Sequence, residues 1–341
     1  MGSVKDLSVL KEPSAVATGT GRFVFSDRYS VFDWGEMPDQ IAEKGKAICL
    51  AAAYFFERLA EMGIKTHYIG VVVDGAAKRL RDLRQPAATM EVKLLRVLKP
   101  KIRDNTYDYS VYREERGNML IPLEVIYRNS LPAGASVFRR LREGSLTLDQ
   151  IGLTEMPVPG QVLAKPLLDV STKLEATDRY INWEEARAIA GLTETEIKEI
   201  RHIALRVNDL ITEEAERLGL YNEDGKVEFG FDEQRTLMLV DALGTLDECR
   251  FTFEGLPVSK EIARIFYRQT DWCREVEEAK MKNRVGWKEL VQTAPPQLPE
   301  RLRNAIAMVY KAYTNELTGR RWFDTPPLKE VLADIRSYLP K

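Results

Sequence analysis

The residues whose types and spacing most clearly suggest a chemical role lie in the segment 224–230, Asp-Gly-Lys-Val-Glu-Phe-Gly, and at Asp241, which follows the apolar run 237–240. Because successive side chains of a strand point to opposite faces, Lys226 and Glu228 share one face. Turn residues between the two runs favour a hairpin that brings Asp241 close to Glu228. Two carboxylates beside an ammonium suit Mg²⁺, which takes one or two protein carboxylates and completes its shell with water and nucleotide phosphates. The alternative is a hairpin whose polar face is merely solvated.

A second group of charges lies in the stretch 78–103, which holds nine Lys or Arg residues against Asp82 and Glu91. Three interpretations remain open. The stretch is a solvated surface, as most charge runs are, or it forms the phosphate-facing wall of a nucleotide cleft. A nucleic-acid patch ranks third, because the stretch contains no aromatic side chains on which bases would stack.

Length and charge limit the class of protein. The chain has 341 residues and a formal net charge of −2, from 50 basic and 52 acidic residues. This length predicts two or three domains, and the balanced charge argues against a dedicated nucleic-acid binder. Since the sequence shows no run of about 18 apolar residues and no secretory signal pattern, we expect a cytoplasmic protein without a membrane partner.

The cysteines do not suggest a metal site. Cys49, Cys249 and Cys273 show no Cys-x-x-Cys spacing, and the chain has just His67 and His202 to complement them. A structural zinc site is therefore not expected. Each cysteine is expected to be a small buried hydrophobe.

Hydrophobic periodicity divides the chain into three regions. Apolar residues at helical spacing predict helices over 48–59, 197–211 and 302–313. Runs of β-branched and aromatic residues predict strands at 23–25, 68–73, 123–127, 226–230 and 237–240. We expect a β-rich lobe over 1–120, a catalytic domain of strands and helix over 121–255, and a mainly helical region over 256–341.

Short segments along nearly the whole chain match the motif order of one enzyme family. They are Ser-Asp-Arg-Tyr-Ser-Val-Phe-Asp (26–33), Ile-Ala-Glu-Lys-Gly (41–45), Gly-Ile-Lys-Thr-His-Tyr-Ile (63–69), Pro-Leu-Glu-Val-Ile-Tyr-Arg-Asn (122–129), Asp-Gly-Lys-Val-Glu-Phe-Gly (224–230) and a C-terminal group at 295–300, 310–313 and 317–319. In this order they resemble D-R-I-S-A-F-D, I-P-x-K-G, the end of the first helix, P-L-E-V-I-V-R-N, D-x-K-x-E-F-G and the C-terminal pattern of longer members of the SAICAR synthase family. SAICAR synthases are phosphoribosylaminoimidazole-succinocarboxamide synthases.

The resemblance implies a fold and a reaction. The fold is α+β, with an N-terminal antiparallel β lobe over an ATP-grasp-like α/β domain and a helical C-terminal extension. The reaction is an ATP-dependent ligation that joins carboxyaminoimidazole ribonucleotide to L-aspartate through an acyl phosphate, in de novo purine biosynthesis. ATP, Mg²⁺ and the two substrates are then the expected partners, without nucleic acid or membrane, and a homo-oligomer is compatible with this expectation.

The resemblance also assigns roles to individual side chains. The expected catalytic residues are Lys226, Arg250 and Asp178. The residues expected to hold ATP are Arg22, Lys93, Glu228 and Asp241, of which the last two also carry Mg²⁺. The residues expected to bind the substrates are Arg128, Ser136, Lys173, Asp33 and Lys44. These types fit the chemistry, because a carboxylate activated by phosphoryl transfer requires cations that position and neutralise several anions.

Some of these assignments keep a structural alternative. A guanidinium offers a planar fork for a carboxylate or phosphate, yet Arg128 and Arg250 are also compatible with surface arginines whose stems cover apolar neighbours. Asp33 and Lys44 are equally compatible with ordinary loop residues.

The sequence departs from the family pattern at several positions. The glycine-rich opening G-K-x-K/R has Thr20 where the family has its first lysine, and Arg22 supplies the second cation. The D-E-I-S-P-D motif has Ala242 in place of its glutamate. The spacing before Ser136 is longer than usual, and the stretch 100–118 is extra. These departures leave two alternatives open: a carboxylate–amine ligase for a different acid or amine, and a non-catalytic nucleotide-binding homologue.

The replacement at Thr20 generates a prediction. If the protein is an active enzyme, another cation must compensate for the missing lysine. Lys93 is the nearest candidate by sequence in the basic stretch 78–103. Thr20→Lys is then expected to leave activity roughly constant, whereas Lys93→Ala should raise the KM for ATP markedly. Steady-state kinetics in varied ATP measures both effects. Robust turnover that is indifferent to Lys93→Ala would rule out the compensation.

Overall fold

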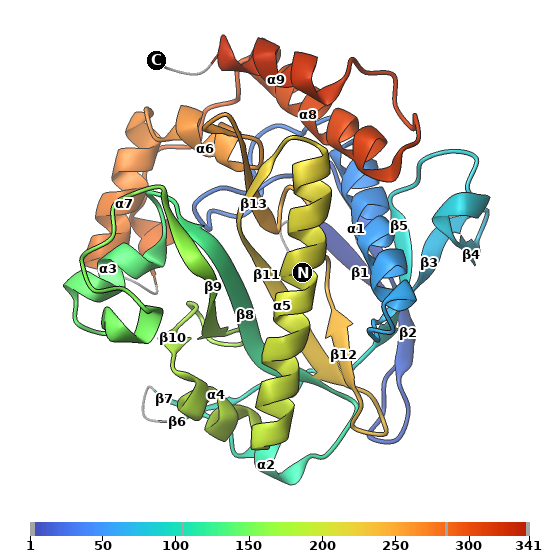
Figure 1. Cartoon of the computed structure of the whole chain (residues 1–341), viewed down its shortest axis with the longest axis vertical. Coiled ribbons are helices and arrows are strands. Elements are labelled where there is room, and N and C mark those ends of the chain that lie inside the picture. The colour runs from blue at the N-terminus through green and yellow to red at the C-terminus, as the bar shows by residue number, and fades with distance from the viewer. Residues whose placement is uncertain (1–3, 104–105, 284–285, 339–341) are drawn as a thin grey trace.

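The chain folds into two main sheets with helices packed around them (Figure 1). The structure is a computed structural model, and it describes residues 4–103, 106–283 and 286–338. Within these ranges every pairing between the named strands is antiparallel.

The first sheet forms the N-terminal lobe and has the strand order β1-β2-β5-β3-β4. Its strands are β1 (Lys5–Lys11), β2 (Gly19–Phe25), β3 (Tyr68–Val73), β4 (Ala76–Lys78) and β5 (Thr89–Leu94). The sheet packs on α1 (Lys44–Glu61), whose buried side includes Phe55, Phe56 and Leu59. The helix predicted over 48–59 and the strands predicted at 23–25 and 68–73 are confirmed.

The second sheet forms the centre of the molecule, and its main path runs β10-β9-β8-β11-β13-β14, with β12 paired to β11 beside that path. Its strands are β8 (Met119–Leu131), β9 (Gln161–Thr172), β10 (Tyr180–Ile181), β11 (Tyr221–Phe231), β12 (Leu237–Val240), β13 (Cys249–Phe253) and β14 (Leu256–Pro257). The predicted hairpin is confirmed as β11 and β12, in which Glu228 lies opposite Val240.

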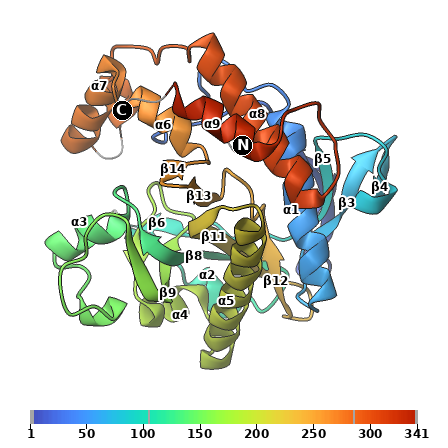
Figure 2. The ribbon, with the colours of Figure 1, turned by 45° about the horizontal axis from the view of Figure 1, so that its top comes forward.

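The remaining elements connect or cover these sheets. They are the ribbon β6 (Lys101–Arg103) and β7 (Thr106–Asp108), the helices α2 (Val111–Glu114), α3 (Ser136–Arg142), α4 (Trp183–Ala190), α6 (Glu261–Tyr267), α7 (Asp271–Lys282), α8 (Glu300–Thr318) and α9 (Leu328–Arg336), and 3₁₀ turns at Leu80–Asp82, Asp149–Ile151 and Trp287–Leu290. Figure 2 shows α8 and α9 at the top of the view, and α8 packs directly on both α1 and α9.

The long helix α5 (Glu194–Arg217) covers the apolar face of the central sheet, against β8, β9 and β11 (Figure 1). It begins with a capping box in which Thr193 accepts from the backbone N–H of Glu196 and the Glu196 side chain accepts from the N–H of Thr193. Its buried stripe includes Ile197 and Ile211, as the sequence predicts. With one face of the sheet closed by α5, the opposite face is free to carry polar groups.

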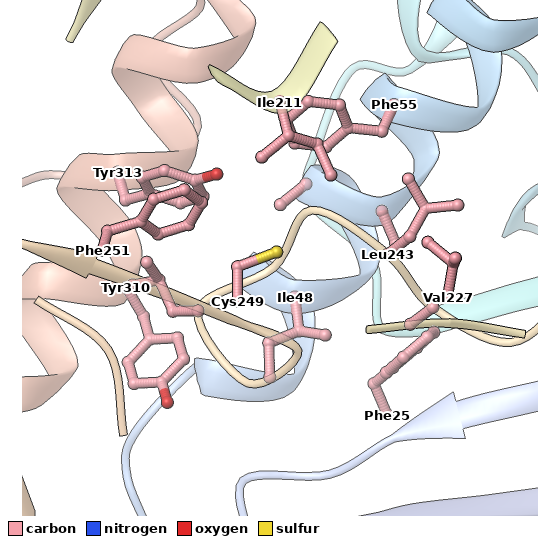
Figure 3. Packing of buried hydrophobic residues seen from close by; sticks show 14 of the residues in the cluster. Phe25, Ile48, Phe55, Ile211, Val227, Leu243, Cys249, Phe251, Tyr310 and Tyr313 are labelled. Atoms are coloured by element: carbon pink, nitrogen blue, oxygen red, sulfur yellow. The ribbon is translucent and has the colours of Figure 1, made fainter. Parts of the chain in front are cut away.

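One hydrophobic core runs through all three expected regions. Figure 3 shows Phe25 and Phe55 of the N-terminal lobe near Val227 of β11, with Ile211 of α5 close by and Tyr313 of α8 in the same cluster. The predicted α+β content is confirmed. The ATP-grasp-like description and the boundaries at 120 and 255 stay predictions.

Two further expectations concern the cysteines and the membrane. All three cysteines are free and buried, which confirms their expected packing role. None of the helices in the described ranges combines the length and apolarity needed to cross a bilayer.

Candidate active site

The polar face of the central sheet carries the candidate site. Residues 224, 226 and 228 of β11 alternate onto this face, and pairing with β8 sets Glu228 opposite Glu124 and Asp224 opposite Arg128. On the other side of β11, Asp224 lies opposite Arg250 of β13. Acidic and basic side chains from three adjacent strands therefore meet on one surface.

Two lysines lie among three carboxylates at one end of this surface. Lys226 Nζ is 2.9 Å from Glu124 Oε1, 3.6 Å from Glu228 Oε1 and 3.7 Å from Glu248 Oε2. Lys173 Nζ is 2.6 Å from Glu228 Oε1 and 3.6 Å from Glu124 Oε1. The structure thus brings together the predicted residues Lys173, Lys226 and Glu228.

The pKa values of this cluster follow from burial and charge. Burial alone would raise the pKa of Glu228, but the Lys173 and Lys226 ammoniums outweigh it and lower the pKa. Burial alone would lower the pKa of Lys226, and the carboxylates of Glu248, Glu124 and Glu228 raise it instead. Burial raises the pKa of Glu124. At neutral pH, Lys226 is therefore cationic and Glu228 anionic.

The N-terminal lobe reaches this cluster through Lys5 of β1. Its ammonium forms a salt bridge with Asp241, which follows β12 in a left-handed conformation with φ 64°. Burial lowers the pKa of Lys5, against the opposing effect of Glu248 and Glu228. His67 Nε2 lies 3.1 Å from the backbone oxygen of Asp241, and burial lowers the pKa of His67 to about 3, so the imidazole is neutral.

A second part of the site is built around the buried guanidinium of Arg128, which is 1% exposed. Arg128 Nη1 donates to Asp224 Oδ2 at 3.0 Å, and Nη2 donates to Ser136 Oγ at 3.3 Å and to Tyr180 Oη at 3.2 Å. Arg250 Nε lies 3.0 Å from the other oxygen of Asp224. Asp224 therefore orients both predicted arginines, of which Arg250 is the more exposed.

A cavity of about 790 Å³ is lined by residues of α3, of the loop between β9 and β10, of α7 and of the 3₁₀ turn that follows α7. Its lining includes the predicted residues Asp33 and Asp178 together with Lys280 and Trp287. Asp33 Oδ2 is 2.9 Å from Lys280 Nζ. Burial raises the pKa of Asp178, and Lys226 acts in the opposite direction, so this carboxyl lies within the electrostatic range of the lysine cluster.

Lys44, predicted to bind substrate, lies in a buried ion pair. Its side chain is 1% exposed, and its ammonium lies 2.6 Å from Asp247 Oδ2 and donates to the backbone oxygen of Arg28 at 3.2 Å. Tyr310 donates to the other oxygen of Asp247 at 2.6 Å. The structure thus encloses Lys44 in a buried ion pair between α1 and the segment before β13, and its substrate contact stays a prediction.

The two predicted ATP contacts of the N-terminal lobe lie on strands β2 and β5. Arg22 donates to Glu91 at 3.0 Å and to the backbone oxygen of Gly75 at 2.8 Å. Thr20 lies directly opposite Lys93 in the register of β2 and β5. The structure does not gather Arg22 and Lys93 with the lysine–carboxylate cluster, although it does place Lys93 beside the altered position Thr20.

The donor set at the β11–β12 hairpin fits Mg²⁺. Among the described residues, no group of three or more His, Cys, Asp or Glu side chains is arranged to hold a metal ion alone. Mg²⁺ needs fewer protein ligands than that, because phosphates and water complete its shell. Glu228 on β11 and Asp241, directly after β12, are the two hard oxygen donors of this set.

Several residues of the site were not selected from the sequence, namely Lys5, Glu124, Glu248, Asp224 and Lys280. Glu124 and Asp224 lie inside matched segments, and strand alternation would have placed Glu124 on the face of Arg128. Lys5 carries no comparable local signal, because its role depends on the pairing of β1 with β2 and on the packing of the two sheets.

Fold and site together define a protein whose central sheet carries lysine and arginine side chains beside carboxylates on one polar face. A family model described as SAICAR synthetase matches residues 2–280. The chain is 49% identical over 339 residues to a protein of Archaeoglobus fulgidus named "Putative phosphoribosylaminoimidazole-succinocarboxamide synthase", covering 99% of this chain and 100% of that protein. The chain therefore belongs to the SAICAR synthetase family.

Solved structures share the fold. A SAICAR synthase from Saccharomyces cerevisiae in complex with SAICAR aligns with a TM-score of 0.62 at 21% identity, covering 94% of each chain. A SAICAR synthetase in complex with ADP aligns with a TM-score of 0.57 at 22% identity, covering 87% of this chain and 99% of that one.

The buried pair of Lys44 and Asp247 generates a prediction about stability. Lys44→Met leaves the Asp247 carboxylate buried without its ammonium, so the free energy of unfolding in urea should fall by about 3–5 kcal/mol at neutral pH. Lys44→Met/Asp247→Asn should recover part of the loss, because it removes the uncompensated charge. Near-normal stability of Lys44→Met with a raised substrate KM would instead support the substrate contact that the sequence predicts.

The same pair has a pH dependence with a defined sign. Burial alone would raise the pKa of Asp247, but Lys44 and Lys260 outweigh it and hold the pKa below its ordinary value, which is about 3.9. When the pKa of a carboxyl is lower in the folded state, the group stabilises the fold at pH values above its unfolded-state pKa. This stabilisation is lost as the pH falls through the folded-state pKa. Unfolding of the wild type should therefore show an acid-dependent loss that Asp247→Asn lacks.

Proposed function

We propose that this chain catalyses the reaction of its family, the ATP-dependent joining of carboxyaminoimidazole ribonucleotide and L-aspartate. The observation that carries the proposal is the polar face of the central sheet. Lys226, Arg128 and Arg250 lie there on the adjacent strands β11, β8 and β13, and Lys173 follows β9 and pairs with Glu228. The reaction brings together the phosphates of ATP, the phosphate and carboxylate of the ribonucleotide, and the carboxylates of aspartate. Such a set of anions requires several fixed cations.

The position of each side chain indicates which anion it would bind. Lys226 is held by Glu124 and Glu228 and is the cation best placed to neutralise the carboxylate that receives the phosphoryl group. Arg250 is oriented by Asp224 and keeps donors free for the ribonucleotide. Asp178, whose pKa burial raises, is a candidate to orient or deprotonate the aspartate amine in the adjoining cavity.

ATP and Mg²⁺ complete the proposal. Glu228 and Asp241 would hold Mg²⁺, which when bound neutralises phosphate charge during phosphoryl transfer. The ADP bound to a solved relative supports a nucleotide site in this fold. We also propose a cytoplasmic location, since ATP and aspartate are metabolites of that compartment.

Phosphate release tests the proposed function. The purified chain is mixed with ATP, Mg²⁺ and carboxyaminoimidazole ribonucleotide, with and without L-aspartate, and inorganic phosphate is measured over time. We expect rapid release that requires both acid and amine. Release with a different acid or amine, but not with this pair, would indicate a related ligase. Nucleotide binding without turnover on any pair would indicate a non-catalytic homologue.

The metal ligands give the sharpest prediction from this proposal. Glu228→Gln or Asp241→Asn removes a charged ligand from a site that works by charge neutralisation, and turnover should fall roughly 10²- to 10³-fold, as for loss of one electrostatic stabiliser. Glu233→Gln is the matched control, because Glu233 is an exposed glutamate in the turn of the same hairpin. Near-normal turnover of both site variants at saturating Mg²⁺ would contradict the metal assignment.

A further inference from the structure

We propose that Tyr107 and Tyr109 are positioning residues, and that the segments 98–103 and 106–115 between β5 and β8, together called the arm, act through them on the active site. Their target is the 173–179 loop, which joins β9 to β10 and carries Lys173 and Asp178. The inference rests on the proposed function for the importance of those two residues. The contacts themselves stand independently of it.

The arm has a fixed base. Both ends meet at Arg96, whose backbone N–H donates to Asn118 O at 3.1 Å and whose backbone oxygen accepts from Leu120 N at 2.9 Å. The Arg96 side chain also donates from Nη2 to Glu115 Oε2 at 2.8 Å and to Gly117 O at 3.0 Å. The basic side chain of Arg96 therefore closes the arm rather than facing solvent.

The body of the arm is packed as firmly as its base. Tyr109 and Tyr112 are 6% and 1% exposed, and their ring centroids lie 6.2 Å apart. Tyr112 Oη donates to Leu98 O at 2.7 Å, which links the two sides of the arm. Because the segment is well packed, hydroxyl groups on it can hold a neighbouring loop in a fixed position.

Two hydroxyls of the arm contact the 173–179 loop. Tyr109 Oη donates to Glu175 Oε1 at 3.0 Å. Tyr107 Oη accepts from the backbone N–H of Ala176 at 2.9 Å. Glu175 is in turn held by Arg179, which donates from Nη2 to Oε1 at 3.0 Å and from Nε to Oε2 at 3.2 Å. The arm thus binds a side chain and a backbone amide at the apex of the loop.

The loop needs such support because the sheet fixes just its ends. Lys173 N donates to Pro122 O at 3.0 Å, and Thr172 N donates to Arg179 O at 3.0 Å. Lys173 faces Glu228 from one of these fixed ends, whereas Ala176 and Asp178 line the cavity from between them. A shift of the apex would therefore move the wall of the cavity that carries Ala176 and Asp178. Displacements of about 1 Å are enough to impair catalysis strongly.

The test compares one double tyrosine variant with a matched control variant. Tyr107→Phe/Tyr109→Phe removes both hydroxyls that contact the loop and keeps the rings in place. Tyr112→Phe removes a hydroxyl of the same arm that bonds within the arm. Amide exchange of 173–179 is measured by mass spectrometry, and KM and kcat are measured for each of the three substrates.

We expect exchange at Ala176 to become about threefold to tenfold faster in the double variant, the factor that corresponds to one hydrogen bond. The kcat/KM for the ribonucleotide and for aspartate should fall roughly tenfold, with the KM for ATP and the melting temperature close to those of Tyr112→Phe. A merely structural role would not lower kcat/KM for two substrates while leaving the KM for ATP and the melting temperature unchanged.

Two results would overturn the inference: exchange in the loop equal to that of Tyr112→Phe, or a kinetic loss shared equally by all three substrates. Failure of the proposed function has a different signature. Wild-type protein that releases no aspartate-dependent phosphate would contradict that function, and the exchange rates would then decide the positioning role alone.

Discussion

The antiparallel register of β8 and β11 places the carboxylates of Glu124 and Glu228 directly opposite each other. Both side chains are buried, and like charges at opposed positions of a sheet repel. The arrangement is tolerated because Lys173 and Lys226 each lie within reach of both carboxylates. The cations of the candidate site are therefore fixed by the sheet before any substrate arrives.

This constraint extends outward as a series of paired charges. Asp224 orients Arg128 and Arg250, and Asp241 pairs with Lys5 of the N-terminal lobe. Because each cation already has a carboxylate that holds it in place, an incoming phosphate or carboxylate meets oriented charges. Such preorganisation avoids the cost of reorienting dipoles during the reaction, which is the main electrostatic advantage of an enzyme site.

Local patterns predicted the elements that carry the site, but tertiary pairing decided which charges meet. Alternation placed Lys226 and Glu228 on one face, and the hairpin to Asp241 followed from turn residues. Glu124 lies 102 residues from Lys226, and the register that joins them depends on packing against α5. The contact between Lys5 and Asp241 depends similarly on how the two sheets pack against each other. Lys44 was assigned by resemblance, and the structure encloses it with Asp247, where the start of α1 meets the segment before β13 and Tyr310 of α8.

The proposed chemistry makes a prediction about one oxygen atom. The γ-phosphoryl group of ATP is transferred to a carboxylate oxygen of the ribonucleotide with release of ADP, the aspartate nitrogen then bonds to the acyl carbon, and the C–O bond to phosphate breaks. With ¹⁸O in the substrate carboxylate, mass spectrometry of the products should find one labelled oxygen in inorganic phosphate. Phosphate free of label, formed together with the amide product, would contradict activation of the carboxylate in this cleft.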